Sequence, residues 1–132
     1  MGTTDHSKKL NVMILGGGIN SAVGSAHVSA LKLSGKYNIV GGFFSRNIQI
    51  NNESAKEYGL TNPRIYNDFE LLCKTEKGKI DAIIILTPTD QHFQQVITCL
   101  KMGIPVICEK ALVGNIKEAQ KIKNLLNEKN GF

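Results

Sequence analysis

Three groups of residues in this chain could do chemistry, and each follows a short apolar run. A glycine-rich turn from Gly16 to Gly24 follows the first run, Thr87-Pro88 closes the fourth, and Glu109-Lys110 closes the fifth. Glycines after a strand let the backbone approach a pyrophosphate, and the helix behind them offers unpaired N–H groups. A lysine at the same edge could hydrogen-bond a hydroxyl and help to move its proton. The order of these groups predicts a dinucleotide site with Lys110 as a catalytic residue beside it.

The glycine turn is longer than the usual dinucleotide-binding spacing G-x-G-x-x-G. Gly16 and Gly18 fit that spacing, but the next glycine is Gly24, which makes the turn about three residues longer. Ile19, Asn20 and Ser21 are expected to bulge there, where they could hydrogen-bond phosphate. A glycine turn that binds nothing is the alternative, although the strand before it and the helix after it favour a ligand.

The end of the second strand bears on which dinucleotide is expected. An acidic residue there would bind the adenosine ribose 2′-hydroxyl, but the chain runs into Phe44, Ser45 and Arg46 instead. Ser45 can hydrogen-bond, and Arg46 could pair with a 2′-phosphate through its planar guanidinium. This favours NADP over NAD as the cofactor. The alternative that Arg46 is only an exposed loop residue stays open.

The other candidates lie at the ends of the fourth and fifth strands. Thr87 and Pro88 are expected under the nicotinamide ribose, and His92 lies one turn into the next helix. A lone histidine is more often a packed or capping residue than a ligand. For Lys110 the alternative is a surface lysine paired with Glu109 or with solvent. The three histidines of the chain have no metal-ligand spacing, so no metal site is expected.

Short apolar runs alternate with helical patterns along the chain. A run of apolar residues without alternation, as in residues 82–86, is typical of a strand buried on both faces of a parallel sheet. Strands are expected at residues 10–15, 37–44, 64–66, 82–86 and 104–108. The expected helices include one with Val23, Ala26, Ala30 and Leu33 on its buried face, one capped by Asn51 or Asn52, and one capped by Asn115 with Ile116 on its buried side.

This alternation predicts right-handed βαβ units and therefore an α/β fold. We expect a doubly wound parallel sheet, the Rossmann fold, with five main strands in the spatial order 3-2-1-4-5 and helices on both faces. Residues 1–9 are expected to be a disordered tail, and residues 10–132 a single dinucleotide-binding domain. Ligands of such sheets bind beyond the carboxyl ends of the strands where the order reverses, which here lies between the first and fourth strands.

Composition excludes several other classes of protein. The net charge is +5 in 132 residues, but the lysines are scattered, which favours a solvated surface over nucleic-acid binding. The three cysteines have no disulfide or metal spacing, and the first ten residues contain no apolar signal core. These features predict a cytoplasmic protein. No apolar run approaches membrane-spanning length, so no membrane partner is expected.

Together these residues resemble the Gfo/Idh/MocA family of NAD(P)-dependent oxidoreductases. The matching segments are residues 16–27, 83–92 and 108–112, which carry the glycine turn, a Thr-Pro-x-x-x-His element and a Glu-Lys element. The resemblance implies a Rossmann domain followed by a larger α/β substrate domain. It implies hydride transfer on a sugar, inositol or other hydroxyl-bearing substrate, with Lys110 beside the nicotinamide and Glu109 and His92 in the site.

The chain departs from the family in two ways. The proline that follows the family's lysine is Ala111 here, and a non-proline cis bond costs about 2.5–4 kcal/mol, so the Lys110–Ala111 bond is expected to be trans. The C-terminal substrate domain is also absent from the sequence. We therefore expect a truncated oxidoreductase domain that is not active alone, with a sugar-like molecule as the possible substrate of the complete enzyme.

Two other functions stay open for a chain of this kind. One is a non-catalytic dinucleotide-binding or regulatory module, and the other is a folded remnant without a ligand. The fifth strand and the last helix are expected to leave an edge and apolar surface uncovered, which predicts self-association.

Overall fold

The computed structural model describes residues 8–131, and in them five parallel strands form one sheet. The strand order is β3-β2-β1-β4-β5, which confirms the predicted doubly wound α/β sheet. The strands are β1 (Leu10–Gly16), β2 (Tyr37–Phe43), β3 (Arg64–Ile65), β4 (Ala82–Leu86) and β5 (Val106–Cys108). Of the predicted tail, residues 1–7 lie outside the described residues, and Lys8 and Lys9 are exposed and outside the regular elements.

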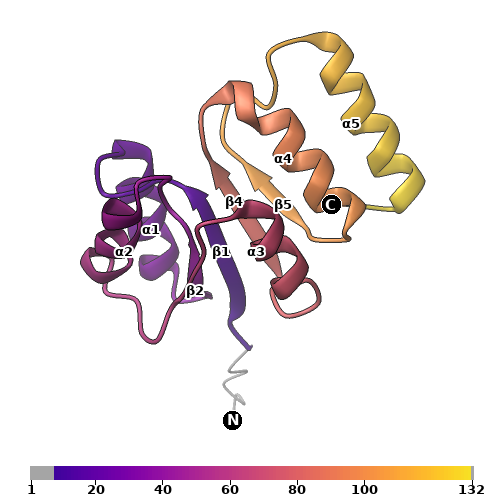
Figure 1. Cartoon of the computed structure of the whole chain (residues 1–132). Helices are drawn as coiled ribbons and strands as arrows, with labels where there is room; N and C mark the ends of the chain where they lie inside the picture. The colour runs from indigo at the N-terminus through magenta and orange to yellow at the C-terminus, as the bar shows by residue number, and fades with distance from the viewer. Residues whose placement is uncertain (1–7, 132) are drawn as a thin grey trace.

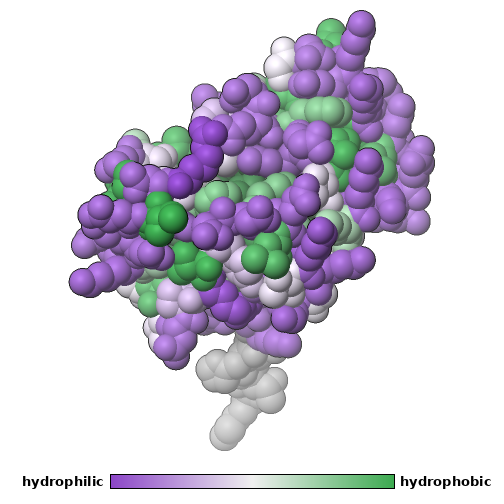
Figure 2. Space-filling model, in the orientation of Figure 1, coloured by the Kyte–Doolittle hydropathy of each residue, from purple (hydrophilic) through white to green (hydrophobic). Residues whose placement is uncertain are grey.

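Five helices connect and follow the strands, and they lie on both faces of the sheet as predicted (Figure 1). They are α1 (Ala22–Ser34), α2 (Ile48–Glu57), α3 (Phe69–Glu76), α4 (Thr89–Lys101) and α5 (Ile116–Lys129). The helices α1 and α2 cover one face, while α3 and α4 cover the other, with α5 packed against α4. The surface seen in Figure 2 is mostly hydrophilic, and its hydrophobic areas are small and separate.

The core has two layers because successive side chains of a strand point to opposite faces. Met13, Ile83 and Ile85 pack beneath α3 and α4, whereas Ile14 and Ile84 pack beneath α1 and α2. All five are at most 1% exposed. A strand with a helix on each side must be apolar at every position, which is the pattern that β4 shows.

The predicted buried face of α1 is wrong. Val23 and Leu33 are 40% and 87% exposed, and the two alanines between them are exposed as well. The buried residues of α1 are Gly24 and Val28. The helix α1 has small apolar residues around most of its circumference, so hydrophobic periodicity does not identify its buried face. The face that holds Gly24 is the buried one, because only a glycine leaves room for the close approach of α1 to Gly17 and Tyr58.

The predicted start of α2 is also wrong, since Asn47 caps the helix rather than Asn51 or Asn52. The Asn47 side chain accepts a hydrogen bond from the Ile50 N–H at 3.0 Å. Asn51 is buried inside the helix, where it accepts from the Phe44 N–H at 2.8 Å and donates to the Tyr66 carbonyl at 2.7 Å. These long-range bonds hold the end of β2 against β3, and nothing local in the sequence predicts them.

The last helix follows the prediction at its start but not along its first turn. Asn115 caps α5 by accepting from the Glu118 N–H at 2.9 Å. Ile116 was expected on the buried side but is 86% exposed, while Ile122 is buried. Asn130 takes the left-handed conformation that ends the helix.

Candidate functional site

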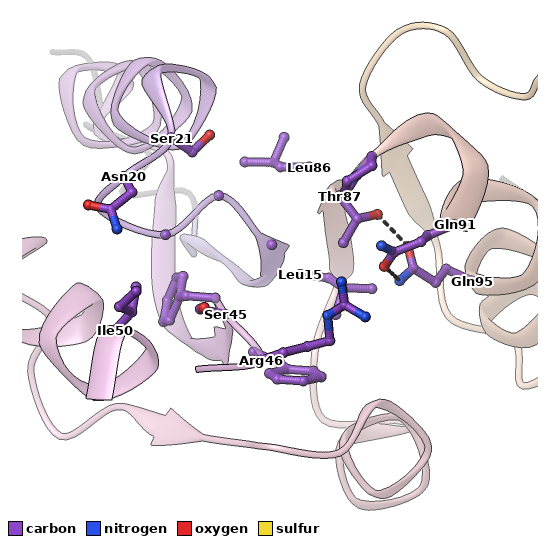
Figure 3. A pocket seen from close by; sticks show the side chains of 16 residues that line it. Leu15, Asn20, Ser21, Ser45, Arg46, Ile50, Leu86, Thr87, Gln91 and Gln95 are labelled. Carbon is purple, nitrogen blue, oxygen red and sulfur yellow. Dashed lines mark hydrogen bonds between the residues drawn. The ribbon is translucent and has the colours of Figure 1, made fainter. Parts of the chain in front are cut away.

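A cleft of about 530 Å³ opens at the carboxyl ends of β1 and β4, where the strand order reverses (Figure 3). It lies where the sequence predicts a ligand. Its walls are the glycine turn, the end of β2, the start of α2, the end of β4 and one side of α4. The lining residues are Leu15, Gly16, Gly17, Gly18, Asn20, Ser21, Phe43, Phe44, Ser45, Arg46, Ile50, Leu86, Thr87, Pro88, Gln91 and Gln95.

The structure brings most of the predicted cofactor residues together in this cleft. Those that line it are Gly16, Gly18, Asn20, Ser45, Arg46, Thr87 and Pro88. The other predicted site residues are not part of its lining, namely Ile19, Gly24, His92, Glu109 and Lys110. Each of these has a place in the structure that explains why it stands outside.

The N-terminus of α1 provides hydrogen-bond donors at the cleft. Ser21 caps the helix, and its own N–H donates to the Gly18 carbonyl at 2.8 Å. The N–H groups of Asn20, Ala22 and Val23 donate to no acceptor within residues 8–131. Free N–H groups at the positive end of a helix dipole suit an anion such as a phosphate.

Ile19 and Gly24 shape the turn from behind. The Ile19 N–H donates to Ser54 Oγ at 3.0 Å, so it is not free for a ligand. A Cβ atom on Gly24 would lie 1.9 Å from the Gly17 carbonyl oxygen, and the Tyr58 hydroxyl donates to that same oxygen at 2.7 Å. Gly24 therefore lets α1 pack against the turn, although the turn is longer than usual.

Arg46 supplies a positive charge at the mouth of the cleft. Its exposed side chain extends from the end of β2 across the cleft toward Thr87 and Gln91 (Figure 3). No carboxylate of residues 8–131 lies within ion-pair distance of it. Ser45 Oγ beside it accepts from the Asn47 N–H at 3.1 Å and keeps its own hydroxyl proton for another acceptor.

Gln91 and Gln95 are cleft residues that the sequence analysis missed. Thr87 Oγ1 donates to Gln95 Oε1 at 2.5 Å, and Gln95 Nε2 donates to Gln91 Oε1 at 3.5 Å. Their spacing of four residues places both amides on the same side of α4. That spacing, shortly after a strand that is followed by Thr87-Pro88, is the sequence signal that could have identified both glutamines.

Glu109 is held by a residue of α1 rather than standing free. His27 Nε2 lies 2.7 Å from Glu109 Oε2, and the Lys110 N–H donates to Glu109 Oε1 at 3.1 Å. The histidine first, and then the backbone N–H, hold the pKa of the Glu109 carboxyl below its usual value. Lys110 itself is exposed at the edge of the sheet, beyond the cleft.

His92 is a packed residue that joins two loops. It is 1% exposed, its Nε2 lies 2.6 Å from the Thr87 carbonyl oxygen, and its Nδ1 lies 2.8 Å from that of Ala111. The Lys110–Ala111 peptide bond is cis, so the prediction of a trans bond is wrong. That prediction used the preference of an isolated bond and took no account of the contacts made by Ala111.

The described residues offer neither a metal cluster nor a reactive thiol. Within residues 8–131 no group of three or more His, Cys, Asp or Glu side chains could hold a metal ion. Cys73 and Cys99 are buried, and burial raises the pKa of the half-buried Cys108 to about 11. A thiol with a raised pKa is a poor nucleophile near neutral pH.

Within residues 8–131 no helix has both the length and the apolar character needed to span a bilayer.

Known proteins resemble this chain along nearly its whole length. Residues 10–132 match the family model of an oxidoreductase family with an NAD-binding Rossmann fold. An uncharacterised oxidoreductase of Bacillus subtilis (strain 168) is 29% identical over 127 residues, which are 93% of this chain and 32% of that protein.

Solved structures give the same result. The crystal structure of an oxidoreductase from Sinorhizobium meliloti has a TM-score of 0.82 and 31% identity, over 95% of this chain and 35% of that one. An inositol dehydrogenase homologue from Azotobacter vinelandii, complexed with NADH and myo-inositol, has a TM-score of 0.86 and 27% identity, over 95% of this chain and 34% of that one. The chain thus spans about a third of the length of these relatives.

Proposed function

The chain belongs to the Gfo/Idh/MocA oxidoreductase family, with its NAD-binding Rossmann fold, and from this we propose that it binds NAD(P) in the cleft between β1 and β4. It would form the nucleotide-binding part of an enzyme that transfers hydride to or from a sugar- or polyol-like substrate. The observation that carries the proposal is that the glycine turn and the Ser21 cap of α1 line a cleft at the switch point of the sheet, beside a helix N-terminus with free N–H groups. The relative with bound NADH and myo-inositol supports the substrate class.

Each part of the cleft suits one part of the cofactor. The glycine turn and the start of α1 would hold the pyrophosphate, and Ser45 with Arg46 would hold the adenosine ribose and a 2′-phosphate. Thr87 and Pro88 would lie by the nicotinamide, which supplies the hydride donor or acceptor when bound. Lys110 would lie beside the nicotinamide, where it would hydrogen-bond the reacting hydroxyl of the substrate and help to transfer its proton.

We also propose that the substrate pocket is built by residues outside this sequence. The relatives are about three times as long as the stretch they share with this chain. The domain alone would then bind cofactor without turning over substrate. The second candidate, a non-catalytic dinucleotide-binding module, is favoured by the same cleft. Turnover of a polyol after a substrate domain is joined to the chain would argue against that second candidate.

The first prediction tests the cofactor site and the role of Arg46. Calorimetric titration of the purified chain should show binding of NADPH. The Arg46→Ala change should weaken NADPH binding by about tenfold to a hundredfold and leave NADH binding nearly unchanged, because a charge-assisted contact to the 2′-phosphate is worth about 1.5–3 kcal/mol. Lys56→Ala, which removes an exposed charge on α2 away from the cleft lining, is the control and should change neither.

The results separate the proposals. Tighter binding of NADH than of NADPH would keep the site but overturn the preference for NADP. Binding of neither dinucleotide would overturn the proposed function and leave a folded remnant.

A second prediction concerns assembly, since we propose that the domain self-associates through the region around β5. The edge strand, the loop after it and the start of α5 carry exposed apolar side chains, with Ile107 40%, Leu112 44% and Ile116 86% exposed. Light scattering should show a mass that rises with concentration, and Ile116→Lys should reduce that rise. Leu33→Lys, at an 87% exposed position on α1, should not. A mass that stays at the monomer value at high concentration would contradict the proposal.

A further inference from the structure

We propose that His27 is a positioning residue for Lys110, which acts by holding the carboxylate of Glu109. The contact joins α1 to the loop that follows β5, across 82 residues of sequence. The inference rests on the proposed function, because the position of Lys110 matters only if its amine acts beside a bound nicotinamide.

Both oxygens of the Glu109 carboxylate are engaged. Oε2 lies 2.7 Å from His27 Nε2, and Oε1 accepts from the Lys110 N–H at 3.1 Å. The side chains of the pair are 30% and 29% exposed, so each is partly shielded from water. Each oxygen of this carboxylate has one contact within residues 8–131, so its position is set from both α1 and the backbone of Lys110. Its evident effect is to fix the backbone at Lys110 relative to α1.

The backbone groups of the residues before and after Lys110 are also held by hydrogen-bond partners. The Ala111 carbonyl contacts His92 Nδ1 at 2.8 Å, and the Glu109 N–H donates to the Ile85 carbonyl of β4 at 3.0 Å. The Lys110 side chain, in contrast, makes no hydrogen bond or ion pair with any described residue. The contacts of Glu109 and Ala111 therefore fix the backbone from which the lysine side chain extends. Of the two histidines, His92 is buried and His27 is the one that can be replaced with less risk to the fold.

We expect His27 also to keep the negatively charged carboxylate of Glu109 from pairing with the amine of Lys110. A carboxylate next to a lysine in sequence can pair with that lysine's amine and withdraw it from the substrate. By engaging Oε2, His27 keeps the carboxylate directed toward α1. Because the N-terminus of α1 also lines the cleft, the same helix would hold the pyrophosphate and, through His27, orient the lysine.

The proposed role of His27 in positioning Lys110 can be tested with two ligands that differ only at the nicotinamide end. NADH and ADP-ribose share the adenosine, the pyrophosphate and the second ribose, but ADP-ribose lacks the nicotinamide. In calorimetric titrations, His27→Ala should weaken NADH binding about fivefold, as expected for coupling within a contact network, and leave ADP-ribose binding unchanged. His27→Gln, whose amide can donate to Glu109, should restore most of the NADH affinity. Ser29→Ala, exposed on the same helix, is the control and should change neither.

A second measurement asks whether the effect passes through the lysine. Adding His27→Ala to Lys110→Ala should cause no further loss of NADH affinity, because the lysine is already gone. NMR titration of Glu109 should show its carboxyl pKa rising toward the ordinary value once His27 is replaced. Additive losses, an equal loss for NADH and ADP-ribose, or unchanged NADH affinity in His27→Ala would each overturn the inference alone. A wild-type chain that binds neither ligand would overturn the proposed function and this inference with it.

Discussion

Gly24→Ala should lower the free energy of unfolding by about 3 kcal/mol or more, among the largest effects of any single methyl group in this domain. The new Cβ atom would lie 1.9 Å from the Gly17 carbonyl oxygen and 2.7 Å from the Tyr58 hydroxyl. The first of these is backbone and cannot rotate away. The helix α1 must therefore move off the turn, which also displaces the free N–H groups at its N-terminus. Urea denaturation measures the loss of stability, and the loss of NADPH binding should accompany it.

Gly114→Ala is the matched control for this change. A Cβ atom at Gly114 would meet nothing within 4 Å, so its effect on the free energy of unfolding should stay within about 0.5 kcal/mol. If the variant Gly24→Ala were as stable as Gly114→Ala, α1 would be free to shift, and the packing role given to Gly24 would be wrong.

The same glycine illustrates what the sequence could predict. The strand order and the position of the cleft could be predicted because strands alternate with helices along the chain. Each strand and helix is recognisable from the hydrophobic pattern of its own residues. Residues at the carboxyl ends of different strands, such as Gly16, Ser45 and Thr87, were predicted together because parallel strands end at one edge of the sheet. The role of Gly24 was predicted less well, since its contact with Gly17 depends on how α1 lies against the turn.

The missed features all depend on contacts between distant segments. Asn51 looked like a helix cap, but its side chain bonds Phe44 and Tyr66. His27 is not among the predicted site residues, and its partner Glu109 lies 82 residues away. The spacing of Gln91 and Gln95 places both on one side of α4, but that side becomes distinctive only where the cleft lies against it. Periodicity predicts that a side chain faces inward or outward, not which polar group it meets.

One such distant contact gives the second large expected effect. Glu76, at the end of α3, has a side chain that is 0% exposed and accepts hydrogen bonds from Arg64 Nε at 2.7 Å, Arg64 Nη2 at 2.8 Å and the Tyr66 hydroxyl at 2.6 Å. Glu76→Gln keeps the shape but removes the charge from this cluster. The loss in the free energy of unfolding should be about 2 kcal/mol, less than for a fully buried pair because Arg64 is 45% exposed. Glu70→Gln, at a 74% exposed position of the same helix, should be nearly neutral.

At acid pH, the difference in the free energy of unfolding between wild type and Glu76→Gln should disappear. Arg64 holds the pKa of the Glu76 carboxyl below its usual value, so the folded state binds its proton less readily than the unfolded chain does. The stabilisation is then complete above the unfolded pKa of about 4.3 and is lost as the pH falls through the folded value. Urea unfolding at pH 7 should separate wild type from Glu76→Gln, and the gap should narrow steadily as the pH is lowered below about 4. A gap that stays constant with pH would mean that the charge of Glu76 does not stabilise the fold, and that the variant loses stability through packing alone.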